Sequence, residues 1–498
     1  MSFTSVACSL ADLVGANVVT AAATARAYLT GVDPAALVRL GTDRVEFFPE
    51  SLQRRLRQFL PQAGQVVGAP LTGSPTGAGS RGFAAATKSH MAPVSGLGYF
   101  RVGEDGRLYV ISKSEHYHAP LGHSFPGYQL LERARALGIP NATHNNTRGP
   151  ITRRLEEELV RLAGGGLNRV LNLETGSLAA EAAFKLVLGR FYRHELTGAS
   201  PLYAGRTPVF LVMGDDDGAV TGNYHGTTNF TQVLRGLWPE LRTKLEATGV
   251  MRVVAIRPNS IADLDAAFRQ FEQAPFKIAG FFHEIVMMNY GARRLTEEFL
   301  QHAHRLCAAH DVPTVVDEIQ SCMWYDGLFL FRQYGLQPTM VVLGKGFPGG
   351  EYPASRILFN ERFDSLPQFG ALVTNGQEEL ASLAYLITMR WTQANGSAIT
   401  AAGQRLETGC RQLAGEFPDT LAGVEGHGHL LGLRFADMAH GQAFVAAMNA
   451  AGFDISVQSY KAECPPVALT KLPTIADDAL IDYTLQRMRD ALTTSRNH

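Results

Sequence analysis

Several features that assign a chain to a particular class are missing from this sequence of 498 residues. Lysine and arginine number 45 and aspartate and glutamate 46, a formal net charge of −1, so the basic surplus typical of nucleic-acid binding is absent. No apolar run reaches the roughly 18 residues that a membrane helix needs. The N-terminus lacks a positively charged start, so we expect neither a signal peptide nor a membrane partner.

Cysteine is also scarce, with five residues and no C-x-x-C spacing. An odd, scattered set excludes a disulfide framework and favours the cytoplasm. His116, His118 and His123 are the obvious candidates for metal ligands, but their spacing matches no closed zinc pattern. We therefore expect no metal site.

What the sequence does contain is an alternation of short apolar, β-branched runs with amphipathic helical segments. Runs of this kind are typical of strands buried on both faces of a parallel sheet, and the alternation predicts an α/β fold. The predicted strands are residues 169–173, 208–213, 251–256, 278–282, 314–316 and 340–343, and the predicted helices include 151–162 and 298–310. A hairpin is expected over 98–112, and further strands near 428–435 and 453–457.

Two of these strands end in residues that suggest chemistry. The run at 314–316 ends at Asp317, and the run at 340–343 ends at Gly344-Lys345. Ligands of such sheets bind at the carboxyl ends of the strands. A lysine that forms a Schiff base and an aspartate that keeps a pyridine nitrogen protonated are the groups that pyridoxal phosphate requires. Each alone is weak evidence, since a strand-end aspartate often caps a helix and G-K-G is often a turn.

The two motifs together are more specific. D-E-I-Q at 317–320, followed by L-G-K-G at 343–346, resembles the class III aminotransferase family, whose members carry D-E-V-Q and L-G-K in this order. The resemblance implies a pyridoxal-phosphate-dependent transferase of fold type I: a large domain with a mostly parallel central sheet flanked by helices, plus a smaller α/β domain built from both chain ends. It also implies Lys345 as the Schiff-base lysine, Asp317 as the partner of the pyridine nitrogen, and Gln320 near the phenolic oxygen.

Other motifs follow the family's order. E-T-G-S-L opens a helical run and resembles the family's S-G-S-E-A, which implies Gly176 and Ser177 at the cofactor phosphate, where free N–H groups of a helix start suit an anion. N-Y-H-G resembles the aromatic-His-Gly segment, with Tyr224 stacked on the cofactor ring and His225 close by. Thr374 matches a threonine that binds the phosphate in the neighbouring subunit, which implies a homodimer with composite active sites.

The resemblance extends over roughly residues 98–490 and divides the chain. We expect an N-terminal extension and linker at 1–97, the N-terminal part of the small domain at 98–150, the large cofactor-binding domain at 151–380 and the C-terminal small domain at 381–498.

The sequence departs from the family where the substrate carboxylate is bound. In the ornithine and γ-aminobutyrate branches an Arg pairs with a Glu, and those positions are Ala462 and Asn289 here. Lys461 is adjacent but lacks the bidentate fork of Arg. Arg148 and Arg356 are alternative anchors, or ordinary surface or interface arginines.

The leading hypothesis is an aminotransferase that moves an amino group from an amine or amino acid to a 2-oxo acid. The missing pair keeps open a racemase, epimerase, aminomutase or decarboxylase on the same cofactor. Trp324 and Tyr325 would suit a bulky or partly apolar substrate. A non-catalytic relative is disfavoured because Asp317, Gln320 and Lys345 are all retained.

Overall fold

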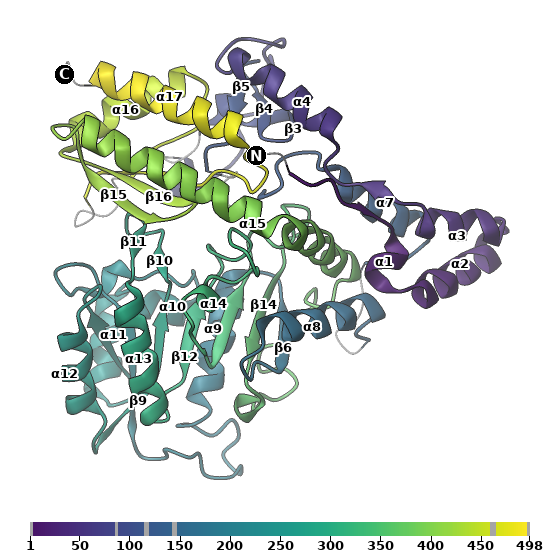
Figure 1. Cartoon of the computed structure of the whole chain (residues 1–498). Coiled ribbons are helices and arrows are strands. Elements are labelled where there is room, and N and C mark those ends of the chain that lie inside the picture. Colours follow the sequence, from purple (N-terminus) through teal and green to yellow (C-terminus); the bar gives the residue numbers. More distant parts are fainter. Residues whose placement is uncertain (1–2, 85–87, 114–118, 142–146, 459–464, 496–498) are drawn as a thin grey trace. The chain divides into compact units, whose positions relative to one another are not determined.

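The computed structural model describes residues 3–84, 88–113, 119–141, 147–458 and 465–495 (Figure 1). His116, His118, Lys461, Ala462 and Cys464 lie outside the described residues. The chain divides into two compact units. One, called here the sheet unit, consists of Ser9–Arg44 and Leu130–Gly396, and the other, the terminal unit, of Met1–Cys8, Val45–Gln129 and Ser397–His498. This division does not test the domain boundaries expected from the sequence, and they stay predictions.

The sheet unit is built on a seven-stranded sheet in the order β6-β14-β13-β12-β9-β7-β8. Its strands are β6 (Arg169–Leu173), β7 (Thr207–Met213), β8 (Arg252–Ile256), β9 (Phe276–His283), β12 (Thr314–Asp317), β13 (Met340–Leu343) and β14 (Ser355–Phe359). The pairs β7–β8, β7–β9, β9–β12 and β12–β13 are parallel. The predicted α/β class and the mostly parallel sheet are therefore confirmed.

β14 is a strand that the sequence analysis did not predict. It runs antiparallel to both of its neighbours, β13 and β6. β14 therefore lies between the strand that leads to Lys345 and the strand that leads to the predicted phosphate loop.

Helices cover both faces of the sheet (Figure 1). On one face, Phe184 of α9 (Gly176–Leu188) stacks on Phe210 of β7 and on Phe230 of α10 (Asn229–Leu234), with ring centroids 4.4 and 4.6 Å apart. On the other, Phe299 of α13 (Glu297–Ala309) meets Phe281 of β9 edge to face at 6.4 Å. Neighbouring residues in a strand point to opposite faces, so these two cores are separate layers.

The remaining elements of the sheet unit are short or peripheral. They are α1 (Leu10–Val14), α2 (Ala16–Thr30), α3 (Pro34–Thr42), α7 (Gln129–Ala136), α8 (Pro150–Ala163), α11 (Pro239–Ala247), α12 (Ile261–Phe271), α14 (Leu330–Gln333) and the strand pair β10 (Val286–Met287) and β11 (Arg293–Arg294). The long helix α15 (Glu379–Glu416) begins in this unit and ends in the other.

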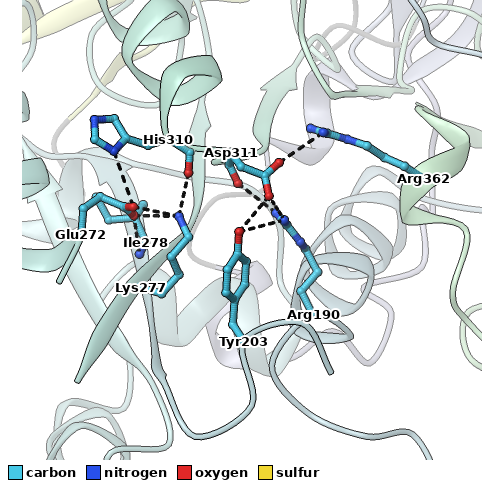
Figure 2. Close-up of polar contacts among 8 residues, drawn as sticks. All are labelled: Arg190, Tyr203, Glu272, Lys277, Ile278, His310, Asp311 and Arg362. Carbon is cyan, nitrogen blue, oxygen red and sulfur yellow. Dashed lines mark hydrogen bonds and ion pairs between the residues drawn. The ribbon is translucent and has the colours of Figure 1, made fainter. Parts of the chain in front are cut away.

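A polar network ties together the amino ends of the central strands (Figure 2). Asp311, three residues before β12, accepts hydrogen bonds from Tyr203 (2.8 Å) and from Arg190, and its other oxygen lies 3.2 Å from Arg362. Burial would raise the pKa of the Asp311 carboxyl, but the tyrosine and the two arginines hold it below its usual value. Lys277 at the start of β9 contacts both oxygens of Glu272 at 2.9 Å. These ion pairs lie at the amino ends of the strands, whereas Asp317 lies at the carboxyl end of β12.

The terminal unit holds antiparallel sheets. A four-stranded sheet has the order β15-β16-β18-β17, with β15 (Leu421–His427), β16 (Leu430–Phe435), β17 (Val457–Gln458) and β18 (Val467–Thr470). A second sheet, β3-β4-β5, contains β3 (Pro93–Leu97), β4 (Phe100–Gly103) and β5 (Leu108–Val110). The other elements are β1 (Ala7–Cys8), β2 (Val45–Glu46), α4 (Glu50–Phe59), α5 (Arg81–Ala84), α16 (Met438–Ala450) and α17 (Asp478–Ser495).

Two expectations for this unit are tested by the strands. The hairpin predicted at 98–112 is confirmed, with β4 and β5 paired antiparallel. The strand predicted at 453–457 is wrong in extent, because the structure pairs only Val457 and Gln458 with β18. Over the described ranges, no helix combines the length and low charge that a membrane span requires.

Candidate active site

Three neighbouring parallel strands bring polar residues to one edge of the sheet. In the register of the sheet, Asp317 of β12 lies opposite Val342 of β13, and Val316 lies opposite His283 of β9. The residues that follow these strands therefore leave the sheet side by side: Asp317 from β12, Gly344-Lys345 from β13 and Glu284 from β9. This is the edge at which ligands of parallel α/β sheets bind.

Asp317 is buried, with 5% of its surface exposed, and both of its carboxylate oxygens are engaged. Oδ1 accepts a hydrogen bond from the backbone N–H of Ile319 at 3.0 Å, and Oδ2 lies 2.9 Å from Nδ1 of His225. A carboxylate accepts, so His225 donates from Nδ1. His225 Nε2 is buried and has no partner among the described residues. The pair thus presents a held carboxylate and an unpartnered ring nitrogen.

Lys345 follows β13 in an unusual backbone conformation. Its φ is +43°, a region that residues with a side chain seldom adopt and that is retained mostly at sites where the surroundings impose it. Burial lowers the pKa of the Lys345 amine, while the negative charges of Glu284 and Asp317 act in the opposite direction. The sheet edge therefore holds a desolvated amine facing two carboxylates.

The predicted phosphate loop lies against the same edge. Thr175 caps α9 by accepting from the N–H of Leu178 at 3.4 Å. A Cβ on Gly176 would lie 2.4 Å from Cδ1 of Ile319, so only glycine allows the start of α9 to approach the loop after Asp317 this closely. The first N–H groups of α9 and its positive dipole end are thereby directed to the vicinity of Asp317, as an anion site requires.

The loop that carries Tyr224 and His225 packs onto the start of α9. The N–H of Thr227 donates to Ser177 Oγ at 3.0 Å. Gly226 has φ +130°, and a Cβ there would lie 2.7 Å from Cα of Ser177. The structure therefore brings Gly176 and Ser177 close to His225 and Asp317, which are far away in the sequence, through contacts of the neighbouring residues Ile319, Gly226 and Thr227.

Tyr224, Gln320 and Thr374 are placed less decisively. The Tyr224 ring is half-buried, with the guanidinium carbon of Arg235 5.1 Å from its centroid. Gln320 is buried and follows Asp317 in the same loop. Thr374 is exposed on the surface of the sheet unit. Their predicted contacts with the cofactor stay predictions, and that of Thr374 requires a second subunit.

Arg356, considered above as a carboxylate anchor, is a structural residue. It is 1% exposed, and its guanidinium donates to the carbonyls of Leu173 (3.2 Å) and Ser355 (2.8 Å) and to Ser382 Oγ (3.2 Å). Arg148 is half exposed and lies 3.4 Å from Glu156. Arg356 lies buried on the strand next to β13, and its guanidinium is bonded within the protein. It is therefore not free to bind a substrate carboxylate.

Trp324 and Tyr325 are also core residues, 0% and 2% exposed. A Cβ on Gly346 would lie 2.9 Å from Cζ3 of Trp324, so the indole packs beneath the turn that carries Lys345. The Trp324 ring supports this turn, and both aromatic side chains are buried in the sheet unit, so their expected contact with a bulky or partly apolar substrate stays a prediction.

Two acidic residues of the edge were not assigned to the site from sequence. Glu284 directly follows β9 at its carboxyl end. Glu318 is fully buried beside Asp317, where burial raises its pKa to about 7, and it accepts hydrogen bonds from the Phe331 N–H at 2.6 Å and from Ser321. The signal for both was an acid directly after a buried strand, the same signal that identified Asp317.

These features can be tested against pyridoxal phosphate. The edge has a desolvated amine at Lys345, a held carboxylate at Asp317 and, beside them, a helix N-terminus approached through Gly176. The buried, unpartnered Nε2 of His225 leaves room for a further hydrogen bond from a ligand. The residues present therefore fit the cofactor. The described residues contain no group of three or more His, Cys, Asp or Glu side chains arranged to hold a metal ion.

The fold and this edge define the class: a fold type I scaffold with a lysine and an aspartate at the ends of adjacent parallel strands. The family model described as Aminotransferase class-III matches residues 83–492. The chain belongs to the class III aminotransferase family, and its cofactor is pyridoxal phosphate, as in that family.

Relatives and solved structures agree with this assignment. An ornithine aminotransferase of Schizosaccharomyces pombe is 27% identical over 266 residues, 51% of this chain and 55% of that protein. An L-lysine-epsilon aminotransferase of Streptomyces clavuligerus is 26% identical over 294 residues, 54% of this chain and 61% of that protein. The chain thus spans little more than half the length of these curated relatives.

The structural similarity extends further along the chain. The ornithine aminotransferase of Toxoplasma gondii aligns with a TM-score of 0.66 at 18% identity, over 81% of this chain and 91% of that one. A transaminase from the marine bacterium Virgibacillus aligns with a TM-score of 0.68 at 15% identity, over 85% and 97%. At such identities the likeness establishes the fold.

Proposed function

We propose that the protein is an aminotransferase that moves an amino group from an amine or amino acid to a 2-oxo acid, with Lys345 as the residue that binds pyridoxal phosphate covalently. The observation that carries the proposal is the placement of Lys345 and Asp317 at the carboxyl ends of adjacent parallel strands in a chain of this family. The curated relatives named above act on ornithine and lysine, which supports an amino acid as one substrate.

Pyridoxal phosphate supplies an aldehyde that condenses with amines and a pyridine ring that, when protonated, withdraws electrons from the reacting carbon. Asp317 would hold the ring nitrogen, the N-terminus of α9 with Gly176 and Ser177 would hold the phosphate, and Tyr224 would cover a ring face. His225 orients the Asp317 carboxylate by donating to Oδ2 at 2.9 Å, and the Ile319 N–H orients Oδ1.

Lys345 is suited to carry a proton as well as to form the covalent bond. Burial lowers the pKa of its amine, which increases the fraction of neutral amine near pH 7. A neutral amine is both nucleophile and base, and once protonated it is an acid. Glu284 and Asp317 act in the opposite direction and limit how far the pKa falls.

The place that binds the substrate carboxylate is not the usual one of the ornithine and γ-aminobutyrate branches. Asn289, at the position of the expected Glu, is neutral and half-buried between β10 and β11. Arg356 is committed to backbone carbonyls. A substrate carboxylate left unpaired in a closed pocket costs several kcal/mol.

We therefore expect glutamate to be a poor amino donor. The measurement is a half-reaction without acceptor: the amount of carbonyl product released per active site, for glutamate and for a panel of amines and amino acids. Good donors should release about one equivalent per site, because the amino group stays on the enzyme.

Two outcomes of this panel would contradict the proposal. If glutamate is the fastest donor, the account of the missing Arg–Glu pair is wrong. If no donor releases carbonyl product while a substrate is epimerised or loses CO₂, the racemase or decarboxylase alternative replaces the aminotransferase. The same assay with Arg148→Ala reports whether that half-exposed arginine contributes to binding.

We further propose that the protein is a homodimer in which Thr374 reaches the phosphate of the neighbouring subunit's cofactor. Its exposure on the sheet unit is compatible with such a contact. Thr374→Val should weaken cofactor affinity by roughly tenfold, the cost of one or two lost hydrogen bonds to a charged group. Thr42→Val, on the exposed end of α3, is the control. Sedimentation that shows a fully active monomer with unchanged cofactor affinity in Thr374→Val would overturn this assignment.

The cytoplasm is the compartment that we propose. Cys8, Cys307, Cys322 and Cys410 are free and buried. Buried free thiols are compatible with a reducing compartment and have no structural need for an oxidising one.

A further inference from the structure

A buried histidine, His283, and a half-buried one, His304, lie in contact at the carboxyl end of β9. His283 is the last residue of β9 and is 0% exposed, and His304 lies on α13. Their Nε2 atoms are 3.1 Å apart, and the ring planes meet at 80° with centroids 5.3 Å apart. Two ring nitrogens at this distance share one hydrogen, so one imidazole donates and the other accepts.

The second nitrogen of His283 decides which one donates. His283 Nδ1 lies 3.2 Å from the backbone carbonyl of Glu284, and a carbonyl only accepts, so Nδ1 carries the hydrogen. A neutral His283 then has its lone pair on Nε2 and accepts from Nε2–H of His304. His304 Nδ1 is buried with no partner among the described residues, as expected for the remaining lone pair.

Burial keeps both rings neutral. It lowers the pKa of His304 to about 4, and that of His283 well below its usual value, where a positive charge on His304 would also oppose protonation. Near pH 7 each hydrogen bond therefore has a fixed direction: His304 donates to His283, and His283 donates to the carbonyl of Glu284.

Glu284 is the residue that this chain of hydrogen bonds reaches. It is 4% exposed, and among the charges acting on Lys345 it has the largest influence, ahead of Asp317. A small rotation of the Glu284 backbone would move its carboxylate relative to the amine, and charge interactions in a poorly solvated site depend strongly on distance.

We propose that His283 and His304 are positioning residues: His304 holds His283 in the tautomer that donates to the Glu284 carbonyl, and this bond fixes the backbone that carries the Glu284 carboxylate, whose charge acts on Lys345. The catalytic consequence of this positioning rests on the proposed function of Lys345. Positive charge on His304 or His225 would oppose protonation of His283, and the hydrogen bond to the Glu284 carbonyl favours it. The charged groups that act on Lys345 are Glu284 and Asp317, the latter bonded to His225.

The test measures Lys345 in the protein without cofactor, so that its outcome does not depend on any transamination. Acetylation by acetic anhydride is followed across pH by peptide mass spectrometry, which gives the midpoint at which Lys345 becomes a reactive, neutral amine. Glu284→Gln removes the favourable charge and should lower this midpoint by about one pH unit or more.

His304→Leu should lower the midpoint in the same direction, because His283 loses its donor and no longer holds Glu284. Adding it to Glu284→Gln should have no further effect. His304→Gln is the matched control, since the Gln side chain places an N–H near the position of His304 Nε2, and it should keep the wild-type midpoint. If His304→Leu fails to fold, His283→Leu and His283→Asn replace it, because Asn can donate to the Glu284 carbonyl in place of Nδ1 and Leu cannot.

The proposal is overturned if His304→Leu keeps the wild-type midpoint while Glu284→Gln shifts it, or if His304→Gln shifts it as far as His304→Leu. In the replacement arm, equal midpoints for His283→Leu and His283→Asn would overturn it. Failure of the proposed function would show instead in the donor panel, with these midpoints unaffected.

Discussion

Replacing Lys345 with alanine is expected to abolish covalent retention of pyridoxal phosphate and to reduce amino transfer by about 10²- to 10⁴-fold or more, the range that a positioned proton-transfer group alone contributes. The amine is the nucleophile and the proton carrier of the proposed site, and the backbone strain at φ +43° shows that the fold directs this residue to the edge. Borohydride reduction followed by peptide mapping should find the cofactor on Lys345 in the wild type and nowhere in the variant.

Two companion variants separate charge from nucleophilicity. Lys345→Arg keeps the cation but lacks a reactive amine, so it should lose the covalent cofactor as completely as Lys345→Ala. Lys244→Ala removes an exposed lysine that pairs with Glu240 on α11 and should behave as wild type. A cofactor found on another lysine, together with normal turnover in Lys345→Ala, would show that the site has been assigned to the wrong residue.

Asp317→Asn is expected to lower activity by about 10²- to 10³-fold, the cost of removing one preorganised electrostatic contact at a reacting centre. Asparagine keeps the size of the side chain and can still accept from the Ile319 N–H, so the loop should persist. What is lost is the negative charge that His225 orients and that would keep the pyridine nitrogen protonated. Cofactor binding should weaken less than turnover, which kcat and the cofactor Kd measured side by side will show.

Asp311→Asn is the control at the opposite end of β12. It also removes a bonded carboxylate, but from the Arg190–Tyr203 network at the amino ends of the strands (Figure 2). It should lower thermal stability and leave turnover per folded molecule unchanged. Wild-type turnover in Asp317→Asn, or an equal loss of turnover in both variants, would separate Asp317 from the chemistry.

Local signals in the sequence were sufficient for the central part of the sheet. The runs that became β12 and β13 are short, apolar and β-branched, and each ends in a polar residue, so their burial and the direction of Asp317 and Lys345 toward one edge could be inferred. Gly176 could be recognised because it opens a helical run within a segment that resembles the family's S-G-S-E-A, whereas its close approach to Ile319 is seen only in the structure.

Pairings between distant segments could not be inferred in this way. β14 has only five residues and begins with Ser-Arg. Its antiparallel pairing with β13 and β6 is set by tertiary packing, which the pattern of so short a segment does not reveal. The contact of His225 with Asp317 joins residues of different loops, and that of His283 with His304 joins a strand to a helix. Such contacts depend on how the elements pack, which a single sequence does not state.

The same limit explains why the burial of Arg356, Trp324 and Tyr325 was not predicted. From sequence, Arg356, Trp324 and Tyr325 were polar or aromatic groups near a site and were therefore considered for substrate binding. In the structure these side chains are buried: Arg356 donates to backbone carbonyls, and Trp324 packs beneath Gly346. The burial of Arg356 depends on β14, which contains it, and on α15, whose Ser382 and Tyr385 it contacts, and such tertiary packing is not stated by the sequence.

The measurement that tests the account most directly follows the amino nitrogen itself. Wild-type protein is supplied with its best donor from the panel, labelled with ¹⁵N, and with an unlabelled 2-oxo acid, and the amino acid formed is analysed by mass spectrometry. The account predicts that the label appears in the new amino acid in proportion to turnover, and that it disappears in Lys345→Ala. Turnover of the donor with no label in any amino acid product, or label transfer that survives in Lys345→Ala, would contradict it.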